Sequence, residues 1–422
     1  MVPTLEYPGV RYPGRMAVSE IYDELRRQAD AYRDYVVANK SVALIIDTEF
    51  GLALQFTVAG KQHKLPISKR GYDQILAWIG LRKDSKLYKR LRFGNDNQRR
   101  VAKDSDCFWP TYVQLVNDHF QIIRGKKLIR TLQKPDGEWY VRAILSDRYR
   151  IIPNDQLFMC AAEKIKSVDA EIWDARLSED AFYLYAVAPG ITAQVRTDRP
   201  FGNGNARWAG DSNDVVNAAI MMRNSETGQG GCEVCPAILE KVSGAYLVRQ
   251  NALSVRHLGH AHEMDALLSV STIKKQNSLV FDKVKDYVDS TFTEDTFQEF
   301  VSKLQDATQD EVADPIAAAD AVRAVYDLSE KRRDSVLKWL MVTGDRSRYG
   351  LASAIAREAH DDADMNADEA VMLERVSSDL IENQTVVSLA RNYKRAAEQK
   401  ATRAARAAEE VTIPVTAAID LE

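Results

Sequence analysis

The sequence predicts an α+β fold, with a mixed, mainly antiparallel sheet domain over residues 41–262 and an α-helical domain after it. Up to residue 262, short apolar runs are separated by turn residues such as Pro135-Asp136-Gly137, as in strands joined by hairpins. From Glu263 on, apolar residues recur at helical spacing. We therefore predict four parts: an N-terminal arm and helix (1–40), the α+β core (41–262), a helical domain (263–385), and a basic Ala-rich helix and tail (386–422).

Helix and strand boundaries in the first third of the chain follow from caps and turns. Ser19 is a suitable N-cap for a helix that we expect to continue to about Ala38. Ser68 is expected to begin a second helix that continues through Ile79. The strands expected up to residue 145 are Ser41–Asp47, Gly51–Val58, Lys61–Pro66, Phe120–Ile123, Lys127–Leu132 and Trp139–Leu145, with a helix at Thr111–Asp118.

Beyond residue 145, Pro153 and Asn154-Asp155 are expected to end a strand and cap a helix over Gln156–Val168. A hairpin is predicted from Ala181–Ala188 and Ile191–Arg196 across Pro189-Gly190. Further strands are expected at Val215–Arg223, Cys232–Leu239 and Ala245–Val248. Helices are expected at Asp265–Leu268, Lys275–Asp289, Glu294–Asp306, Pro315–Glu330, Arg332–Val342, Tyr349–His360, Asp368–Ile381 and Val386 to about Glu410.

The composition excludes several classes of protein. Hydrophobic residues make up 45% and charged residues 28% of the chain, as in ordinary soluble globular proteins. No run approaches the ~18 apolar residues of a membrane span, and the N-terminus lacks the basic flank and apolar stretch of a signal peptide. We therefore expect a cytoplasmic protein that does not bind membranes. Four cysteines are too few for a disulfide framework in 422 residues.

The net charge of -4 hides a strongly basic segment. Between Lys61 and Arg150 there are 21 Lys and Arg against 9 Asp and Glu, a surplus of +12; the rest of the chain, with 36 bases and 52 acids, stands at -16. A basic segment in an acidic protein is a candidate anion-binding face. Its densest part, the basic stretch of residues 82–103, contains nine bases: Arg82, Lys83, Lys86, Lys89, Arg90, Arg92, Arg99, Arg100 and Lys103.

This basic stretch has two interpretations. Its bases could neutralise several phosphates while Tyr88 and Phe93 stack on unpaired nucleic-acid bases, each stack contributing ~1–3 kcal/mol. Alternatively, it is a solvated helix face whose aromatic side chains turn inward to the core.

Two polar motifs stand out beside the basic segment. The first, Leu145-Ser146-Asp147-Arg148-Tyr149-Arg150, interrupts an apolar strand. In a structural role Asp147 would pair with an arginine, while Ser146 and Tyr149 would close the strand end; in a binding role Arg148 or Arg150 would contact phosphate. The second motif is Asn224-Ser225-Glu226-Thr227-Gly228-Gln229-Gly230-Gly231. We predict a tight hairpin turn there, the alternative being a backbone nest for phosphate.

Both motifs resemble the phage- and plasmid-borne family named domain of unknown function 932, and the resemblance covers roughly residues 60–265. A weaker similarity continues in Arg348-Tyr349-Gly350-Leu351-Ala352-Ser353-Ala354. The resemblance implies a phage- or plasmid-encoded protein that works in the host cytoplasm. It implies a lineage more readily than an activity.

A zinc site is a further hypothesis. Cys232 and Cys235, together with His257 and His260, supply the residue types of a tetrahedral structural site. The alternative is two buried thiols beside a polar turn, and the family pattern has no cysteine pair at this point. No cofactor is otherwise required.

No catalytic signature is present, and we predict no catalytic residues. Ser146 with Asp147 lacks an evident histidine partner, and the sequence contains no His-Glu-x-x-His, nucleophile elbow or Rossmann fingerprint. Asp361, Asp362 and Asp364 could hold Mg²⁺ in a nuclease, but a cluster favoured by a helix dipole is the simpler interpretation.

The leading hypothesis is a non-enzymatic nucleic-acid-binding protein whose partner is single-stranded DNA, with strand annealing in recombination or replication as its most specific form. The alternatives are a structural or regulatory protein that acts through protein contacts, including contacts within a homo-oligomer, and a metal-dependent nuclease. The predicted contact residues are the nine bases of the basic stretch with Arg124, Lys126, Lys127, Arg148 and Arg150.

Overall fold

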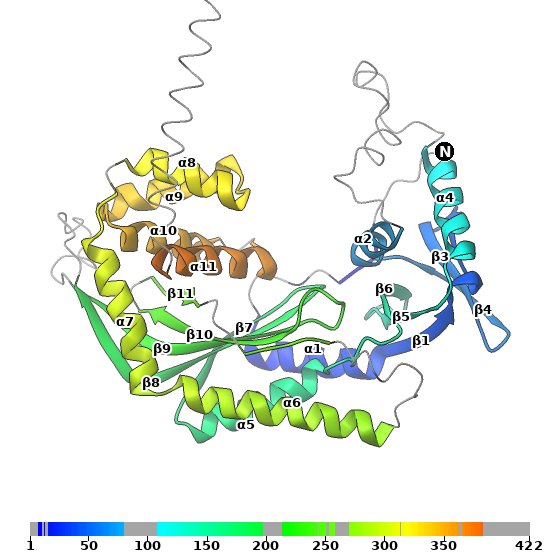
Figure 1. Cartoon of the computed structure of the whole chain (residues 1–422), viewed down its shortest axis with the longest axis horizontal. Helices are drawn as coiled ribbons and strands as arrows, with labels where there is room; N and C mark the ends of the chain where they lie inside the picture. Colours follow the sequence, from blue (N-terminus) through cyan, green and yellow to red (C-terminus); the bar gives the residue numbers. More distant parts are fainter. Residues whose placement is uncertain are drawn as a thin grey trace, which may run out of the picture.

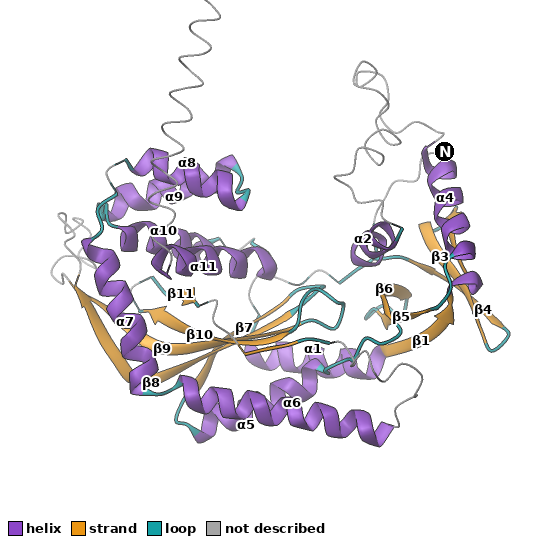
Figure 2. Ribbon diagram, in the orientation of Figure 1, coloured by secondary structure: helices purple, strands orange, loops and turns teal. Residues whose placement is uncertain are grey.

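The structure of the protein is a computed structural model. It describes residues 7–10, 12, 16–79, 108–196, 213–241, 243–249, 253–257, 270–312, 314–362 and 365–382. The predicted α+β fold is confirmed, because antiparallel strands dominate the described chain up to residue 255 and only helices follow (Figure 2).

Two three-stranded antiparallel sheets form what we call the small unit. One sheet has the order β1 (Tyr32–Ala38), β5 (Lys126–Gln133) and β6 (Trp139–Ser146), and the other has the order β2 (Val42–Asp47), β3 (Gly51–Val58) and β4 (Lys61–Pro66). Helices α2 (Lys69–Trp78) and α4 (Phe108–Ile122) complete this unit. A parallel bridge between Ile67 and Val141 joins the two sheets, and one apolar cluster that includes Leu54, Ile75 and Ile144 lies at their centre.

A third antiparallel sheet, the large sheet, has the order β11 (Ala245–Val248), β10 (Cys232–Glu240), β9 (Asn213–Asn224), β8 (Phe182–Arg196) and β7 (Glu171–Leu177), with β12 (Leu253–Val255) paired to β10. Helices α1 (Val18–Ala31), α5 (Asn154–Ser167) and α6 (Val270–Thr291) lie along one face, and α10 (Arg348–Asp361) and α11 (Ala367–Glu382) cover the other (Figure 1). Because side chains alternate along a strand, Phe182 and Leu184 join one core cluster while Tyr183 and Tyr185 join another.

The C-terminal helices share the core of the large sheet. They include α7 (Glu294–Gln309), α8 (Pro315–Tyr326) and α9 (Glu330–Thr343), besides α6, α10 and α11. The largest apolar cluster runs from Ile21 on α1 to Ile381 on α11 and so crosses the boundary predicted at residue 262. We call the large sheet with α1 and α5–α11 the large unit.

The N-terminal helix is shorter than predicted. It ends at Ala31, and the segment Tyr32–Ala38, expected to be helical, is strand β1. All seven residues of this strand pair with β5, more than 80 positions further along the chain. That tertiary pairing overrides the helical propensity of the segment.

Two strand predictions are also wrong. Phe120–Ile122 is the end of α4, because Phe120 lies on the same fully buried stripe as Tyr112 and Val116. The hairpin predicted across Pro189-Gly190 is the single strand β8, which pairs with β9 on both sides of a register shift. The shift removes the proline, which has no N–H to donate, from the ladder. The sequence pattern did not predict β7 or β12.

Candidate functional site

The two polar motifs meet in space. The Tyr149 hydroxyl donates to the carbonyl of Ser225 at 2.7 Å, across 76 positions of the chain. The N–H of Tyr149 donates to the carbonyl of Ser146 at 2.9 Å and closes the turn that follows β6. Ser146 and Tyr149 therefore close the strand end, as the structural interpretation of the motif predicted. We call residues 146–154 and 224–231 together the junction, because they connect the small unit to the large unit.

Glu226 is the charged centre of the junction. Its side chain is 4% exposed, and one carboxylate oxygen accepts from the Arg130 guanidinium at 2.8 Å. The other oxygen accepts from the N–H of Asn154, the first residue of α5, at 2.8 Å. Arg130 also donates to Asp34 at 2.8 Å and lies 3.7 Å from the ring centroid of Tyr32. Glu226 thus neutralises a buried arginine of the small unit and caps a helix of the large unit.

Asn154 was predicted to cap α5, but Pro153 is the N-cap and makes no side-chain cap bond. The Asn154 side chain instead accepts from the Asn224 amide at 2.7 Å. Asn224 also donates to the carbonyl of Ile152 at 2.8 Å. These bonds hold the end of β9 against the start of α5.

The turn between β9 and β10 is a hairpin, as predicted. Gly228 has a φ of 82°, and a Cβ at this position would lie 2.6 Å from a methyl group of Leu145. Gln74 on α2 donates to the carbonyl of Thr227 at 2.7 Å and accepts from the N–H of Ile144 at 2.7 Å. A glycine is needed because the turn packs directly on β6 with a left-handed backbone.

A polar cavity of about 880 Å³ lies beside the junction at the start of α2. Lys69 and Arg70 contribute positive charge to its walls, and Asp73, Glu179 and Asp180 contribute negative charge. Arg70 donates twice to Asp180, at 2.7 and 2.9 Å. Because both signs of charge line the cavity, it is not the purely cationic site that a phosphate would favour.

Four of the predicted nucleic-acid contacts gather at one end of the small unit. The Lys127 ammonium lies 4.3 Å from the ring centroid of Trp78, and Trp78 is next to Ile79, where the described chain stops before the basic stretch. Arg124, Lys126 and Arg148 are exposed and form no ion pair with any described residue. Burial lowers the pKa of Lys127. We call these four cations the basic end, and the three exposed ones are available to an external anion.

One further prediction for the first motif needs correction. Asp147 does not pair with an arginine among the described residues; it is exposed and accepts from the Ser146 hydroxyl at 3.4 Å. The turn leaves its carboxylate exposed, and the charge of Asp147 partly opposes the lowering of the Lys127 pKa by burial. Arg150 is half-buried, and its backbone N–H and carbonyl bond to the carbonyl and Nδ1 of His257 at 2.7 and 2.9 Å.

The nine bases of the basic stretch lie outside the described residues: Arg82, Lys83, Lys86, Lys89, Arg90, Arg92, Arg99, Arg100 and Lys103.

Three cations that the sequence analysis did not select lie near the junction. Arg256 precedes His257, and Lys274 and Lys275 belong to the first turns of α6. The Asn277 amide donates to the carbonyl of Ile151 at 3.2 Å and so places the start of α6 against the junction. The signal was present in the sequence, since residues 270–281 contain two lysines and no acid.

The structure does not bring the two thiols of the zinc hypothesis together. Cys232 and Cys235 lie three positions apart on β10, so their side chains point to opposite faces and enter different apolar clusters. Burial raises the pKa of each thiol to about 12, which disfavours the thiolate that zinc requires. No group of three metal-ligating side chains occurs in the described part of the chain; His260 lies outside it.

The carboxylates considered for Mg²⁺ are engaged elsewhere. Asp362 pairs with Arg332 at 2.5 Å, and Asp361 pairs with Arg357 at 3.2 Å. Asp364 lies outside the described residues. The two described carboxylates therefore neutralise arginines of the helical region.

His257 should make the junction sensitive to acid. Its ring is 3% exposed and stacks on Tyr149 with a centroid separation of 4.9 Å. Because Nδ1 faces a carbonyl oxygen, it must donate, and Nε2 is left as a buried acceptor without a hydrogen-bond partner in the described structure. Burial lowers the pKa of His257 below its ordinary 6.5, and the charges of Arg150 and Arg223 act in the same direction. The hydrogen bond to the Arg150 carbonyl and the charge of Glu226 oppose them in part.

His257 therefore takes up a proton more readily in the unfolded chain than in the folded protein. The stabilisation from neutral His257 is complete above pH 6.5 and is lost as the pH falls from 6.5 towards the folded pKa. Urea unfolding between about pH 7.5 and 5.5 should show wild-type stability falling more steeply than that of His257→Gln. Equal pH slopes for the two proteins would exclude His257 as the titrating group.

Comparison with known proteins identifies no relative: no family model, no curated protein and no solved structure matches the chain. The resemblance of the two motifs to domain of unknown function 932 therefore stays a prediction. Among the described residues, no helix combines the length and the apolar character needed to cross a membrane.

Proposed function

We propose that the protein binds nucleic acid, with single-stranded DNA as the preferred form, through the basic end and the basic stretch together. The observation that carries this proposal is the contact of Lys127 with Trp78. It sets Arg124, Lys126 and Arg148 beside the point where the chain continues into nine further bases.

The availability of these cations supports the proposal. Arg130 and Arg142, on the same sheet as the basic end, are 3% and 1% exposed, and they donate hydrogen bonds to internal partners. By contrast, Arg124, Lys126 and Arg148 are exposed and unpaired within the described residues. Free surface cations can release counterions from a phosphate backbone on binding, and this supplies sequence-independent affinity.

The preference for single strands rests on Tyr88 and Phe93, which lie among the bases of the basic stretch. Aromatic rings can stack on unpaired bases, whereas the bases of a duplex are already stacked on each other. The lineage that we propose with this function, a phage or plasmid origin with a role in recombination or replication, rests on the resemblance of the two motifs alone.

The proposal predicts salt-dependent binding of labelled oligonucleotides, measured by fluorescence polarisation with single- and double-stranded probes. Lys126→Ala with Arg148→Ala should weaken single-strand binding and lower the slope of log K against log salt by about 1.4, at about 0.7 per phosphate contact. The matched control is Lys166→Ala with Arg196→Ala, two exposed cations of the large unit. If the wild type does not bind at low salt, the proposal is wrong, and a protein partner becomes the better explanation of the surface.

A further inference from the structure

We infer that a bound single strand continues from the basic end across the junction and onto the large unit, where Arg256, Lys274 and Lys275 contact its phosphates. This inference rests on the proposed function and adds to it a second contact area. None of the three residues was part of the nucleic-acid surface expected from the sequence.

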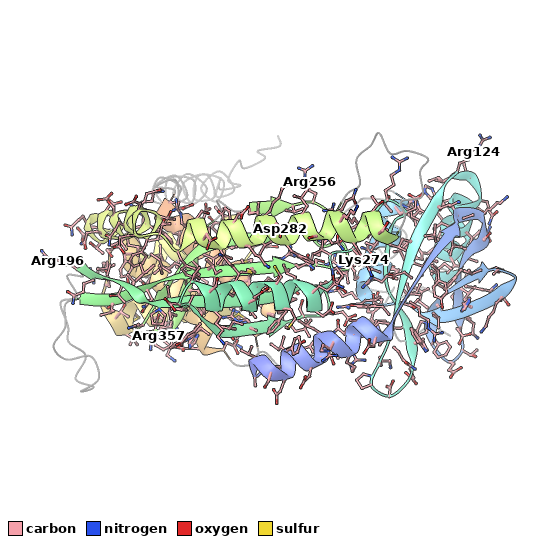
Figure 3. The ribbon with its side chains drawn as sticks, turned by 90° about the horizontal axis from the view of Figure 1, so that it is seen from below. Arg124, Arg196, Arg256, Lys274, Asp282 and Arg357 are labelled. Atoms are coloured by element: carbon pink, nitrogen blue, oxygen red, sulfur yellow. The ribbon has the colours of Figure 1, made fainter. Side chains whose placement is uncertain are left out.

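The position of the three cations supports the inference. The Arg150 N–H donates to the carbonyl of His257 at 2.7 Å, so Arg256 lies one residue from a backbone bond to the turn that carries Arg148. Asn277, two residues after Lys275, is bonded to Ile151 of the same segment at 3.2 Å. Figure 3 shows Arg256 and Arg124 pointing outward along the same edge of the molecule. A strand held at the basic end would therefore meet these cations next.

The charge along α6 changes sharply between its two halves. Lys274 and Lys275 form no ion pair with the described residues, and α6 contains no acidic residue before Asp282. In the second half, Lys285 pairs with Glu163 of α5 at 3.3 Å, and Asp289 pairs with Lys164 of α5 at 2.6 Å. The charges in the second half are therefore paired with charges on α5, whereas the positive charges in the first half are exposed to solvent. The positive end of the helix dipole is also at this half.

The junction fixes the two basic areas relative to each other. Glu226 binds Arg130 of the small unit and the first N–H of α5 in the large unit, both at 2.8 Å. Cations that are already held at a set spacing lose little freedom when a polyanion binds across them. A strand that spans the junction should therefore gain affinity from both areas without a rearrangement of the two units.

The test is the triple variant Arg256→Ala, Lys274→Ala and Lys275→Ala in the full chain, titrated with the same single-stranded probe. Loss of three phosphate contacts should lower the salt slope by about 2, at about 0.7 per contact, and weaken binding about tenfold or more at moderate salt. The matched control is Arg196→Ala, Lys166→Ala and Lys331→Ala, which removes the same charge from exposed positions on β8, α5 and α9.

The outcomes separate this inference from the proposed function. If the basic-end variant loses affinity but the Arg256, Lys274 and Lys275 variant behaves like its control, the strand does not reach the large unit and the inference is wrong. If both variants lose affinity and the control does not, the inference stands. If the wild type binds no strand at all, the proposed function fails first. Equal urea midpoints for wild type and variants establish that the fold is unchanged.

Discussion

Glu226→Ala should destabilise the folded protein by about 3–5 kcal/mol, because it removes one partner of a buried ion pair and leaves the other charge uncompensated. The side chains of Glu226 and Arg130 are each 4% exposed, and their charged groups lie 2.8 Å apart. The substitution also removes the acceptor for the N–H of Asn154 at the start of α5. Urea unfolding followed by circular dichroism measures the loss as a shift of the midpoint.

Asp34 provides the matched control, because it pairs with the same arginine but its side chain is 30% exposed. Asp34→Ala should cost about 1 kcal/mol or less, as is usual for a pair that water can reach. Glu226→Gln should fall between the two, since it keeps an acceptor for Asn154 but loses the charge. Similar costs for the alanine substitutions at Glu226 and Asp34 would contradict the central role of Glu226 in the junction.

Glu374→Ala should cause a comparable loss, about 3–5 kcal/mol, at a second buried pair. Glu374 on α11 is 1% exposed and lies 2.9 Å from Arg176 on β7. It also accepts from the hydroxyl of Tyr185 on β8 at 2.5 Å. Since this carboxylate holds α11 on the large sheet, thermal unfolding of the variant should begin well below that of the wild type.

A paired substitution distinguishes a lost ion pair from lost packing at this site. Arg176→Met with Glu374→Leu removes both charges and replaces them with apolar side chains of similar size. Because the desolvation cost of the two charges disappears with them, the double variant should recover most of the stability that Glu374→Ala loses. A double variant as unstable as the single one would show that the packing around Tyr185, and not the uncompensated Arg176 charge, determines the cost.

The cations of this chain fall into a buried group that stabilises the fold and an exposed group that we expect to bind nucleic acid. The buried arginines, Arg130 and Arg176, have carboxylate partners and should affect unfolding when altered. The exposed cations of the basic end and of the start of α6 have no ion-pair partner among the described residues and should affect only nucleic-acid binding.

Elements whose signals are local were predictable from the sequence. Ser68 caps α2 and accepts from the N–H of Gly71 at 3.0 Å, as the sequence suggested. Strands β2, β3 and β4 lie at the predicted positions within one residue, because turns at both ends delimit them. A cap or a turn is specified by a few neighbouring residues, so its signal survives without knowledge of the fold.

Elements that depend on a distant partner were not predictable. Tyr32–Ala38 has a helical neighbour on one side, and only its pairing with β5 makes it a strand. Strand β8 passes straight through Pro189-Gly190 because β9 pairs with it on both sides. Cys232 and Cys235 have the spacing of metal ligands, yet the alternation of β10 sends them to opposite faces. The sequence records spacing but not which strand lies alongside.

The features of the candidate site also fall into those that were predictable from the sequence and those that were not. The sequence alone determined the excess of positive charge between Lys61 and Arg150 and both polar motifs, because composition and short patterns need no tertiary context. Only the tertiary structure decided that Glu226 meets Arg130 across 96 positions of the chain, and that the start of α6 lies against Ile151. A buried charge takes whichever partner the folded chain brings within hydrogen-bond distance, and that choice depends on packing and not on order along the chain.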